Sequence, residues 1–196
     1  MPENWSIQEL LNAGWSEPDL AWEGVAERTA EAVSQRDYVR AKEEAGQALR
    51  IARADFESID PRLGTSLANY GLCLSLSGDS QGVAPLFQKA LEAWRRADPW
   101  IARMTAPRVA RSSLFHMRME ALHRDTYRAR WQLRWRELAD DAIRRLESLE
   151  AAEATFGPPT DDILARWQRE RPAMLNDTRK LMAAAYLLLA PPAPSA

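Results

Sequence analysis

Apolar residues recur at intervals of three and four along most of the chain, and β-branched runs are scarce. This spacing is typical of amphipathic helices and gives little support for strands. The sequence contains four signals for the start of a helix. Two have the form of a capping box, Ser6-Ile-Gln-Glu9 and Ser16-Glu-Pro-Asp19, and two place an acid before a proline, Asp60-Pro61 and Asp98-Pro99. The pattern predicts an all-α protein with helices at about 6–12, 18–34, 37–55, 61–77, 80–96, 100–122, 124–153, 161–171 and 173–190.

The chain has 196 residues, which is long enough to bury a core as one domain without a disulfide or a metal. Gly157-Pro158-Pro159 is the clearest break, and no low-complexity linker divides the chain. We therefore expect a single domain over 1–196. Its parts are a helical extension (1–17), two helix pairs (18–97), a third pair (98–156), capping helices (157–190) and a disordered tail (191–196).

Two stretches of the chain resemble each other at a spacing of 42 residues. Shifting the second stretch back by 42 places Ala90-Leu91 on Ala48-Leu49 and Asp79 on Asp37. Helix pairs that repeat at such a period cannot bury their apolar faces alone and stack on one another. The period therefore predicts a short α-solenoid of antiparallel helix pairs, an architecture that commonly serves as a recognition surface.

Residues 18–97 resemble tetratricopeptide repeats, in the long 42-residue form known from kinesin light chains. Gly71 stands where the family has the small residue that lets two helices cross. Gly78 matches the glycine of the tight turn, Phe87 the aromatic residue of the second helix, and Ala90-Leu91 the pair that ends it. The second repeat matches the pattern well and the first departs from it in its first helix. The third pair keeps only the helical rhythm.

The resemblance implies a concave groove, lined by the first helix of each repeat, that takes a client protein or peptide. Carried over to this chain, the groove residues of the second repeat are Thr65, Ala68, Asn69, Leu72 and Leu76. Asn69 can donate to and accept from a peptide backbone at once, or it can form a hydrogen bond within its own repeat. Ala26 and Ala30 stand where repeats that clamp a terminal carboxylate carry lysine and asparagine, so we do not expect such a clamp.

Charge is distributed unevenly, although the formal net charge is only −2. Residues 1–93 hold 8 basic and 15 acidic side chains, whereas residues 94–145 hold 13 and 6. Arg108, Arg111 and Arg118 fall near one helical face. If that face lines the groove, it favours an acidic or amphipathic client. The alternatives are a solvated face, or a basic surface that docks on the acidic first third of the same or another copy.

The sequence gives little support for a catalytic site. There is no Gly-rich phosphate loop, nucleophile elbow or Cys/His pairing, so we expect a protein that is not an enzyme and needs no cofactor. His116, Glu120 and His123 share one helical face and leave a metal-dependent enzyme as an alternative. A pI near 5.8 makes nucleic acid an unlikely partner, because phosphate binding needs a dominant positive footprint.

The remaining features concern location. Cys73 is the sole cysteine and the N-terminus lacks the features of a secretory signal, so we expect a cytoplasmic protein. The longest apolar run, Leu181 to Ala190, is about half of a membrane span, which argues against a membrane partner. The leading expectation is a non-catalytic interaction module, acting as an adaptor, regulator or assembly chaperone. The other alternative is a self-assembling structural module.

Overall fold

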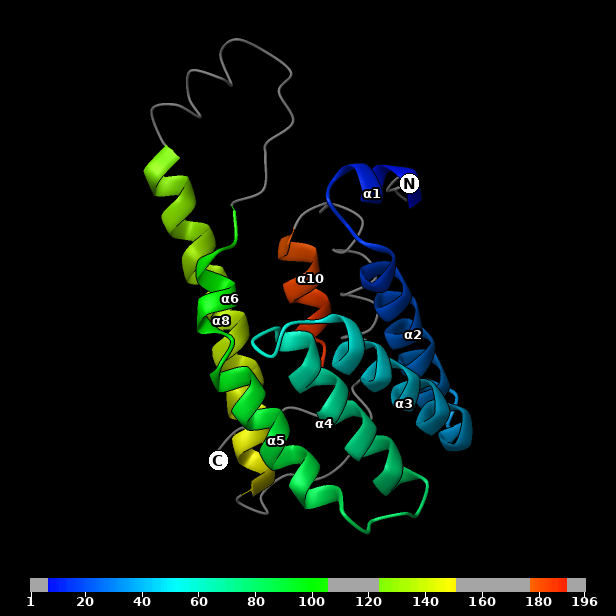
Figure 1. Cartoon of the computed structure of the whole chain (residues 1–196). Helices are drawn as coiled ribbons and strands as arrows, with labels where there is room; N and C mark the ends of the chain where they lie inside the picture. Colours follow the sequence, from blue (N-terminus) through cyan, green and yellow to red (C-terminus); the bar gives the residue numbers. More distant parts are fainter. Residues whose placement is uncertain (1–6, 106–123, 151–176, 190–196) are drawn as a thin grey trace.

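The computed structural model describes residues 7–105, 124–150 and 177–189, and every regular element in these ranges is a helix (Figure 1). The all-α prediction is confirmed. The helices are α1 (Ile7–Asn12), α2 (Glu17–Ser34), α3 (Tyr38–Asp55), α4 (Pro61–Leu76), α5 (Val83–Arg95), α6 (Asp98–Ala102), α8 (Arg124–Glu150) and α10 (Asp177–Ala184). The bounds of α2 to α5 and of α8 agree with the predicted ones to within three residues. The helix predicted at 161–171, the tail and most of 100–122 lie outside the described residues.

Local sequence explains where the main helices begin. At α2 the Ser16 hydroxyl accepts from the Asp19 N–H at 3.3 Å, and the Asp19 carboxylate accepts from the Ser16 N–H at 2.8 Å. This is the predicted capping box, which satisfies two backbone donors that the helix cannot. At α4 the Asp60 carboxylate accepts from the Arg62 N–H at 2.9 Å. Both caps use carboxylates that also take part in the ion pairs described below.

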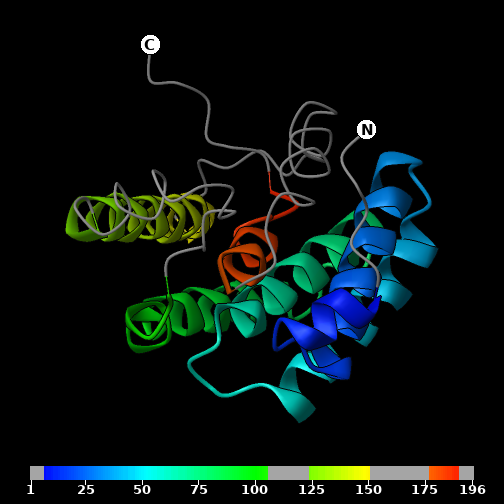
Figure 2. The same cartoon turned by 90° about the horizontal axis from the view of Figure 1, so that it is seen from above.

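Successive helices pack in adjacent pairs, α2 on α3, α3 on α4 and α4 on α5. Together they form a layer with α10 lying on one face of it, against α4 (Figures 1 and 2). α8 packs along α5 and flanks α10 on the other side. α4 is therefore the central helix of the molecule, since it contacts a neighbour on either side within the layer and is covered by α10.

The close crossing of α4 and α5 depends on Gly64. A Cβ atom at this position would lie 2.6 Å from Cδ1 of Trp94 and 2.9 Å from the carbonyl oxygen of Ala90. At Gly71, where the family resemblance places the crossing residue, the nearest atoms would be ring carbons of Phe87 at 3.3 Å. The tightest approach of the two helices therefore lies two turns earlier than the resemblance implies.

One apolar cluster extends through all of the larger helices. Its largest members are Trp22 of α2, Trp94 of α5 and Trp135 of α8, each almost fully buried. The buried face of α3 consists mainly of small side chains that let neighbouring helices approach closely: Ala41, Ala45, Ala48 and Ala52. Among the described residues, no helix combines the length and the apolar character that crossing a bilayer requires.

The chain departs from the predicted helices in two places. α6 begins at Asp98, with Ala97 as its N-cap residue, and ends at Ala102. Residues 103–105 are not helical, so the helix predicted at 100–122 is not continuous. The helix predicted at 173–190 ends at Ala184, and the following residues form an irregular buried stretch. This second difference creates the candidate site.

Candidate functional site: a groove on α4 that holds the C-terminal segment

One face of α4 is covered by residues 177–189, which we call the C-terminal segment. Thr65, Asn69 and Leu72 follow one another at helical intervals of four and three, so they share this face. All three are buried. Leu72 belongs to the same apolar cluster as Leu187 of the segment. The structure thus places on one face of α4 three residues that the resemblance expects to line a groove, and the C-terminal segment covers that face. We call this covered face, between α2 and α8, the groove.

Asn69 binds the main chain of the segment with both ends of its amide. Its Oδ1 accepts from the Leu188 N–H at 2.9 Å, and its Nδ2 donates to the Tyr186 carbonyl at 3.5 Å. One turn earlier, the Thr65 hydroxyl donates to the Ala184 carbonyl, the last of α10. These side chains satisfy main-chain groups that a continuing helix would satisfy internally. The sequence left two roles open for Asn69: binding a peptide backbone, or a hydrogen bond within its own repeat. The observed bonds reach a backbone outside the repeat, and that backbone belongs to the same chain.

The far end of the segment is apolar. Residues 186–189 are all buried, and α8 contributes polar contacts around them. Arg145 donates from Nη1 to the Leu189 carbonyl at 3.4 Å. At the other end of the segment, Nε1 of Trp135 donates to the Thr178 hydroxyl at 3.1 Å. α8 therefore forms the second wall of the groove, opposite α2.

The near end of the segment is basic and meets acids on α2. Arg179 donates to both carboxylate oxygens of Glu23, at 2.9 and 2.7 Å. Lys180 lies 2.9 Å from an oxygen of Asp19. Both cations also lie over the ring of Trp15, with Arg179 Cζ 5.0 Å and Lys180 Nζ 5.3 Å from its centroid. This arrangement of two carboxylates and an aromatic face is well suited to a pair of adjacent cations.

Arg62 connects this end of the groove to the start of α4. Its guanidinium lies 2.5 Å from Asp19 and 2.6 Å from Asp60, and 3.6 Å from the centroid of the Phe56 ring. Burial by itself would raise the pKa of Asp19. The charge of Arg62 and hydrogen bonds from Lys180, the Ser16 main chain and Arg62 outweigh burial and lower that pKa to about 2. Asp19 therefore stays ionised at neutral pH.

We call Asp19, Glu23 and Asp60, together with Arg62, the acidic end of the groove. Three carboxylates and one guanidinium give it a net charge of about −2, and all four side chains are buried. Arg179 and Lys180 supply the two positive charges that balance it. The sequence left open whether Arg108, Arg111 and Arg118 line the groove, and these residues lie outside the described ones. The described part of the groove carries the opposite charge.

Several residues singled out by the sequence lie outside the described residues: Arg108, Arg111, Arg118, His116, Glu120 and His123. Within 7–105, 124–150 and 177–189, no group of three His, Cys, Asp or Glu side chains is placed to hold a metal ion. Cys73 is buried, and burial raises the pKa of its thiol to about 12. Its thiolate is therefore scarce at neutral pH, which does not suit a nucleophile.

Contact between the basic middle and the acidic first third occurs within the chain. Arg103 lies 2.8 Å from Glu57, in an exposed pair. The hydrogen bond between Glu57 and Arg103, followed by the attraction of their charges, lowers the pKa of Glu57 and raises the pKa of Arg103. Exposed pairs of this kind contribute little to stability. In this pair a basic residue of the segment 94–145 contacts an acidic residue of the segment 1–93 within one chain, without a second copy.

The sequence analysis missed the residues of the acidic end. A weak signal exists: Asp19 and Glu23 are four apart on a helix that also carries Trp22, and Arg179-Lys180 directly precedes the ten-residue apolar run. A buried carboxylate cannot be told from a solvated one without knowing what lies opposite. Here the opposite element is 156 residues away.

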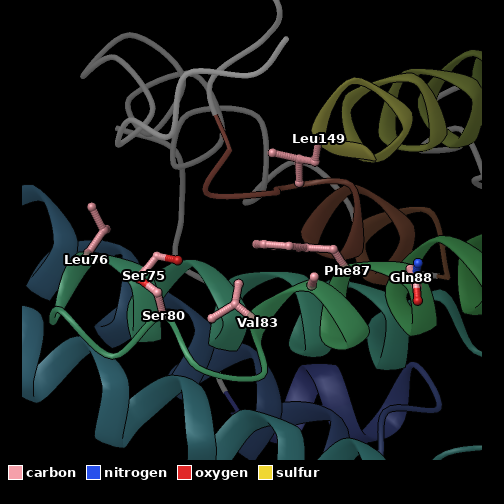
Figure 3. A pocket seen from close by; sticks show the side chains of 8 residues that line it. Ser75, Leu76, Ser80, Val83, Phe87, Gln88 and Leu149 are labelled. Carbon is pink, nitrogen blue, oxygen red and sulfur yellow. The ribbon is translucent and has the colours of Figure 1, made fainter. Parts of the chain in front are cut away.

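A cavity lies at the other end of α4, away from the acidic end (Figure 3). Its volume is about 800 Å³, and side chains from the end of α4, the start of α5 and the end of α8 line it: Ser75, Leu76, Ser80, Val83, Ala84, Phe87, Gln88 and Leu149. Among the described residues that line it, most are apolar and none is charged. These residues offer apolar contact to a ligand.

Comparison of the chain with protein-family models, with curated proteins and with solved structures found no match.

Proposed function

We propose that this chain is a non-catalytic interaction module, built from tetratricopeptide-like helix pairs, whose groove binds a peptide segment of a client protein. The observation that carries the proposal is the pair of bonds from Asn69 to main-chain atoms of residues 186 and 188. A side chain that reads only the backbone accepts many sequences, which is what an adaptor, regulator or assembly factor requires.

The groove combines the properties of a peptide site. Polar side chains of α4, Thr65 and Asn69, are aimed at a backbone, and buried apolar residues such as Leu72 surround them. Binding sites of this kind draw affinity from apolar burial and orientation from a few polar groups. The contacts of the C-terminal segment support the proposal, because a peptide in the same place would meet the same side chains.

The proposal requires that the C-terminal segment leave the groove when a client binds. The segment contacts α4, α8 and the acidic end of α2, and most of its side chains are buried, so its departure exposes part of the apolar cluster. A client then competes with a segment held in the same chain, and its apparent affinity falls by the fraction of molecules that are open. The proposed module is therefore closed in the absence of client.

The test uses a full-length variant in which the segment is held less tightly. In R179A/K180A, which we call the open variant, Glu23 loses its buried partner and the segment should dissociate. A fluorescent 13-residue peptide of residues 177–189 is titrated in, and its anisotropy is measured. We expect saturable binding that weakens by about tenfold or more when Asn69→Leu is added to the open variant. Leucine has a volume similar to that of asparagine but makes neither of the two hydrogen bonds of the Asn69 side chain.

Either of two results would contradict the proposed function. The first is no binding of the peptide to the folded open variant. The second is binding that Asn69→Leu leaves unchanged, which would place the peptide elsewhere. With the groove established, the client is the protein that the open variant retains from cell extract and that the additional Asn69→Leu change releases.

A further inference from the structure

We infer that the client segment is basic at its start and apolar at its end: two adjacent cationic residues, followed after about five residues by a stretch of leucine or aromatic side chains. The inference rests on the proposed function and names the chemistry of the partner. The occupant in this structure has that form. Leu181 is already buried directly after Lys180, and the run in which every side chain is apolar and buried begins at Tyr186, six residues after Lys180.

The cationic requirement comes from Glu23. Its side chain is only 6% exposed and is paired through both oxygens with Arg179. A client that covers this carboxylate without supplying a cation would leave a buried charge uncompensated. Arg62 already faces two carboxylates, Asp19 and Asp60, so its single positive charge does not also offset the charge of Glu23.

A second and independent feature of the same end points to cations. The ring of Trp15 is buried, and it receives both Arg179 and Lys180 over its face at 5.0 and 5.3 Å from the centroid. The face of an aromatic ring attracts a cation through the ring's quadrupole, and it does not attract a carboxylate. The acids set the sign of the partner's charge, and the ring sets where the charge lies.

The apolar requirement comes from the opposite end. Leu187, Leu188 and Leu189 are almost fully buried, and each such side chain returned to water would lose favourable burial energy. The distance between the acidic end and the apolar end is fixed by the helices that carry them. Spacing between cations and apolar residues is therefore part of the recognition, in addition to composition.

This inference reverses the charge expected from Arg108, Arg111 and Arg118, which lie outside the described residues. An acidic peptide placed along residues 177–189 would bring its carboxylates against Asp19, Glu23 and Asp60. The acidic end already carries about two excess negative charges, so the encounter would be repulsive. Selection against acidic segments is thus as much a part of the site as attraction of basic ones.

The test compares three 13-residue peptides on the open variant by fluorescence anisotropy. The first has the sequence of residues 177–189. The second replaces Arg179 and Lys180 with alanine, and the third replaces both with glutamate. We expect the alanine peptide to bind at least about a hundredfold more weakly than the first, and the glutamate peptide more weakly still or not measurably.

A change in the groove supplies the matched control. Introducing Glu23→Arg into the open variant brings the net charge of the acidic end from about −2 to about 0, so the difference in affinity between the basic and the glutamate peptide should largely disappear. The difference between the first and third peptides should also shrink as salt is raised, because charge attraction is screened. Both results are expected only if the acidic end reads the peptide's charge.

The outcomes separate the inference from the function on which it rests. If all three peptides bind within about twofold, the groove binds peptides but does not select basic ones, and the inference fails while the proposed function stands. If none binds, both fail. If the chain forms dimers that the basic peptide dissociates, the occupant is the segment of a second copy, and the assignment to a client is overturned.

The open variant could unfold, and circular dichroism will show whether it does. In that case the same peptides are titrated against the wild-type chain. The competing segment then lowers all three affinities by the same factor and leaves their order unchanged. Equal affinities in that experiment overturn the inference as well.

Discussion

Arg179 donates to both carboxylate oxygens of Glu23, at 2.9 and 2.7 Å, and so joins the last described helix to the second one across 156 residues of sequence. Both side chains are buried. A bidentate pair of this kind gives orientation as well as energy, because the planar guanidinium matches the carboxylate at one geometry only. It fixes where the C-terminal segment begins in the groove.

The Glu23–Arg179 pair should show strong coupling in a double-mutant cycle. Glu23→Gln or Arg179→Gln alone leaves a buried charge without its partner and should cost about 3–5 kcal/mol. The double variant should cost less than the sum of the singles by roughly 1–3 kcal/mol. Urea unfolding of the four proteins measures this. Additive effects would mean that the two charges do not depend on each other.

Acid should weaken the fold through Asp19, whose pKa is about 2 in the folded chain against an ordinary value of 3.8. Because the unfolded chain binds this proton first as the pH falls, the contribution is complete above about pH 4 and is lost as the pH falls towards 2. The shift corresponds to roughly 2 kcal/mol.

Urea unfolding of wild type and of Asp19→Asn at several pH values between 2 and 6 isolates this contribution. Other carboxylates titrate in both proteins, so the quantity of interest is the difference between them. That difference should be largest near pH 5 and should shrink towards pH 2. A difference that stays constant over the whole range would rule out the proposed stabilisation of ionised Asp19.

Gly64 and Gly71 should respond differently to alanine. Both lie inside α4, where alanine is favoured over glycine by about 1 kcal/mol. At Gly64 the new methyl group would meet Trp94 and the Ala90 carbonyl, so Gly64→Ala should destabilise the protein by roughly 1–3 kcal/mol. Gly71→Ala meets the Phe87 ring at 3.3 Å and Cβ of Leu86 at 3.5 Å and should be close to neutral. Thermal unfolding compares the two, and equal effects would contradict the assigned crossing point.

Cys73 provides a reporter of the core. It is fully buried and its thiol has a pKa of about 12, so it should react with thiol reagents only when the surrounding helices open. Labelling by a chromogenic disulfide in native buffer should be slow and should accelerate at the urea concentration where circular dichroism reports unfolding. Fast labelling of the native protein would show that α4 opens locally.

Much of the fold could be predicted from the sequence because it depends on local pattern. The Asp60-Pro61 signal and the apolar spacing located the start of α4 at Pro61 correctly and its end to within one residue of Leu76. The end of α10 could not be predicted in this way. Residues 185–189 consist of good helix formers, yet Thr65 and Asn69 bind the main chain there and end the helix.

The face of α4 that carries Thr65, Asn69 and Leu72 was named in advance because the resemblance to tetratricopeptide repeats implied it, and helical spacing keeps the three residues together. The role of that face as a binding site stays a prediction. The acidic end was not named in advance, because its meaning depends on which element lies opposite. Nothing in the residues around Glu23 indicates that Arg179 will be its partner, and burial of the pair arises only when the C-terminal segment lies on α4.

The central claim is that the groove on α4 is a peptide site from which the chain's own segment can be displaced. The most direct measurement is amide hydrogen exchange of the wild-type chain with and without an excess of the unlabelled peptide of residues 177–189, followed by mass spectrometry. The account predicts that the peptide speeds exchange in the chain's own residues 177–189 while α4 keeps its protection. Unchanged exchange in the segment, or loss of protection only together with α4, would show that the segment is a fixed part of the core and contradict the account.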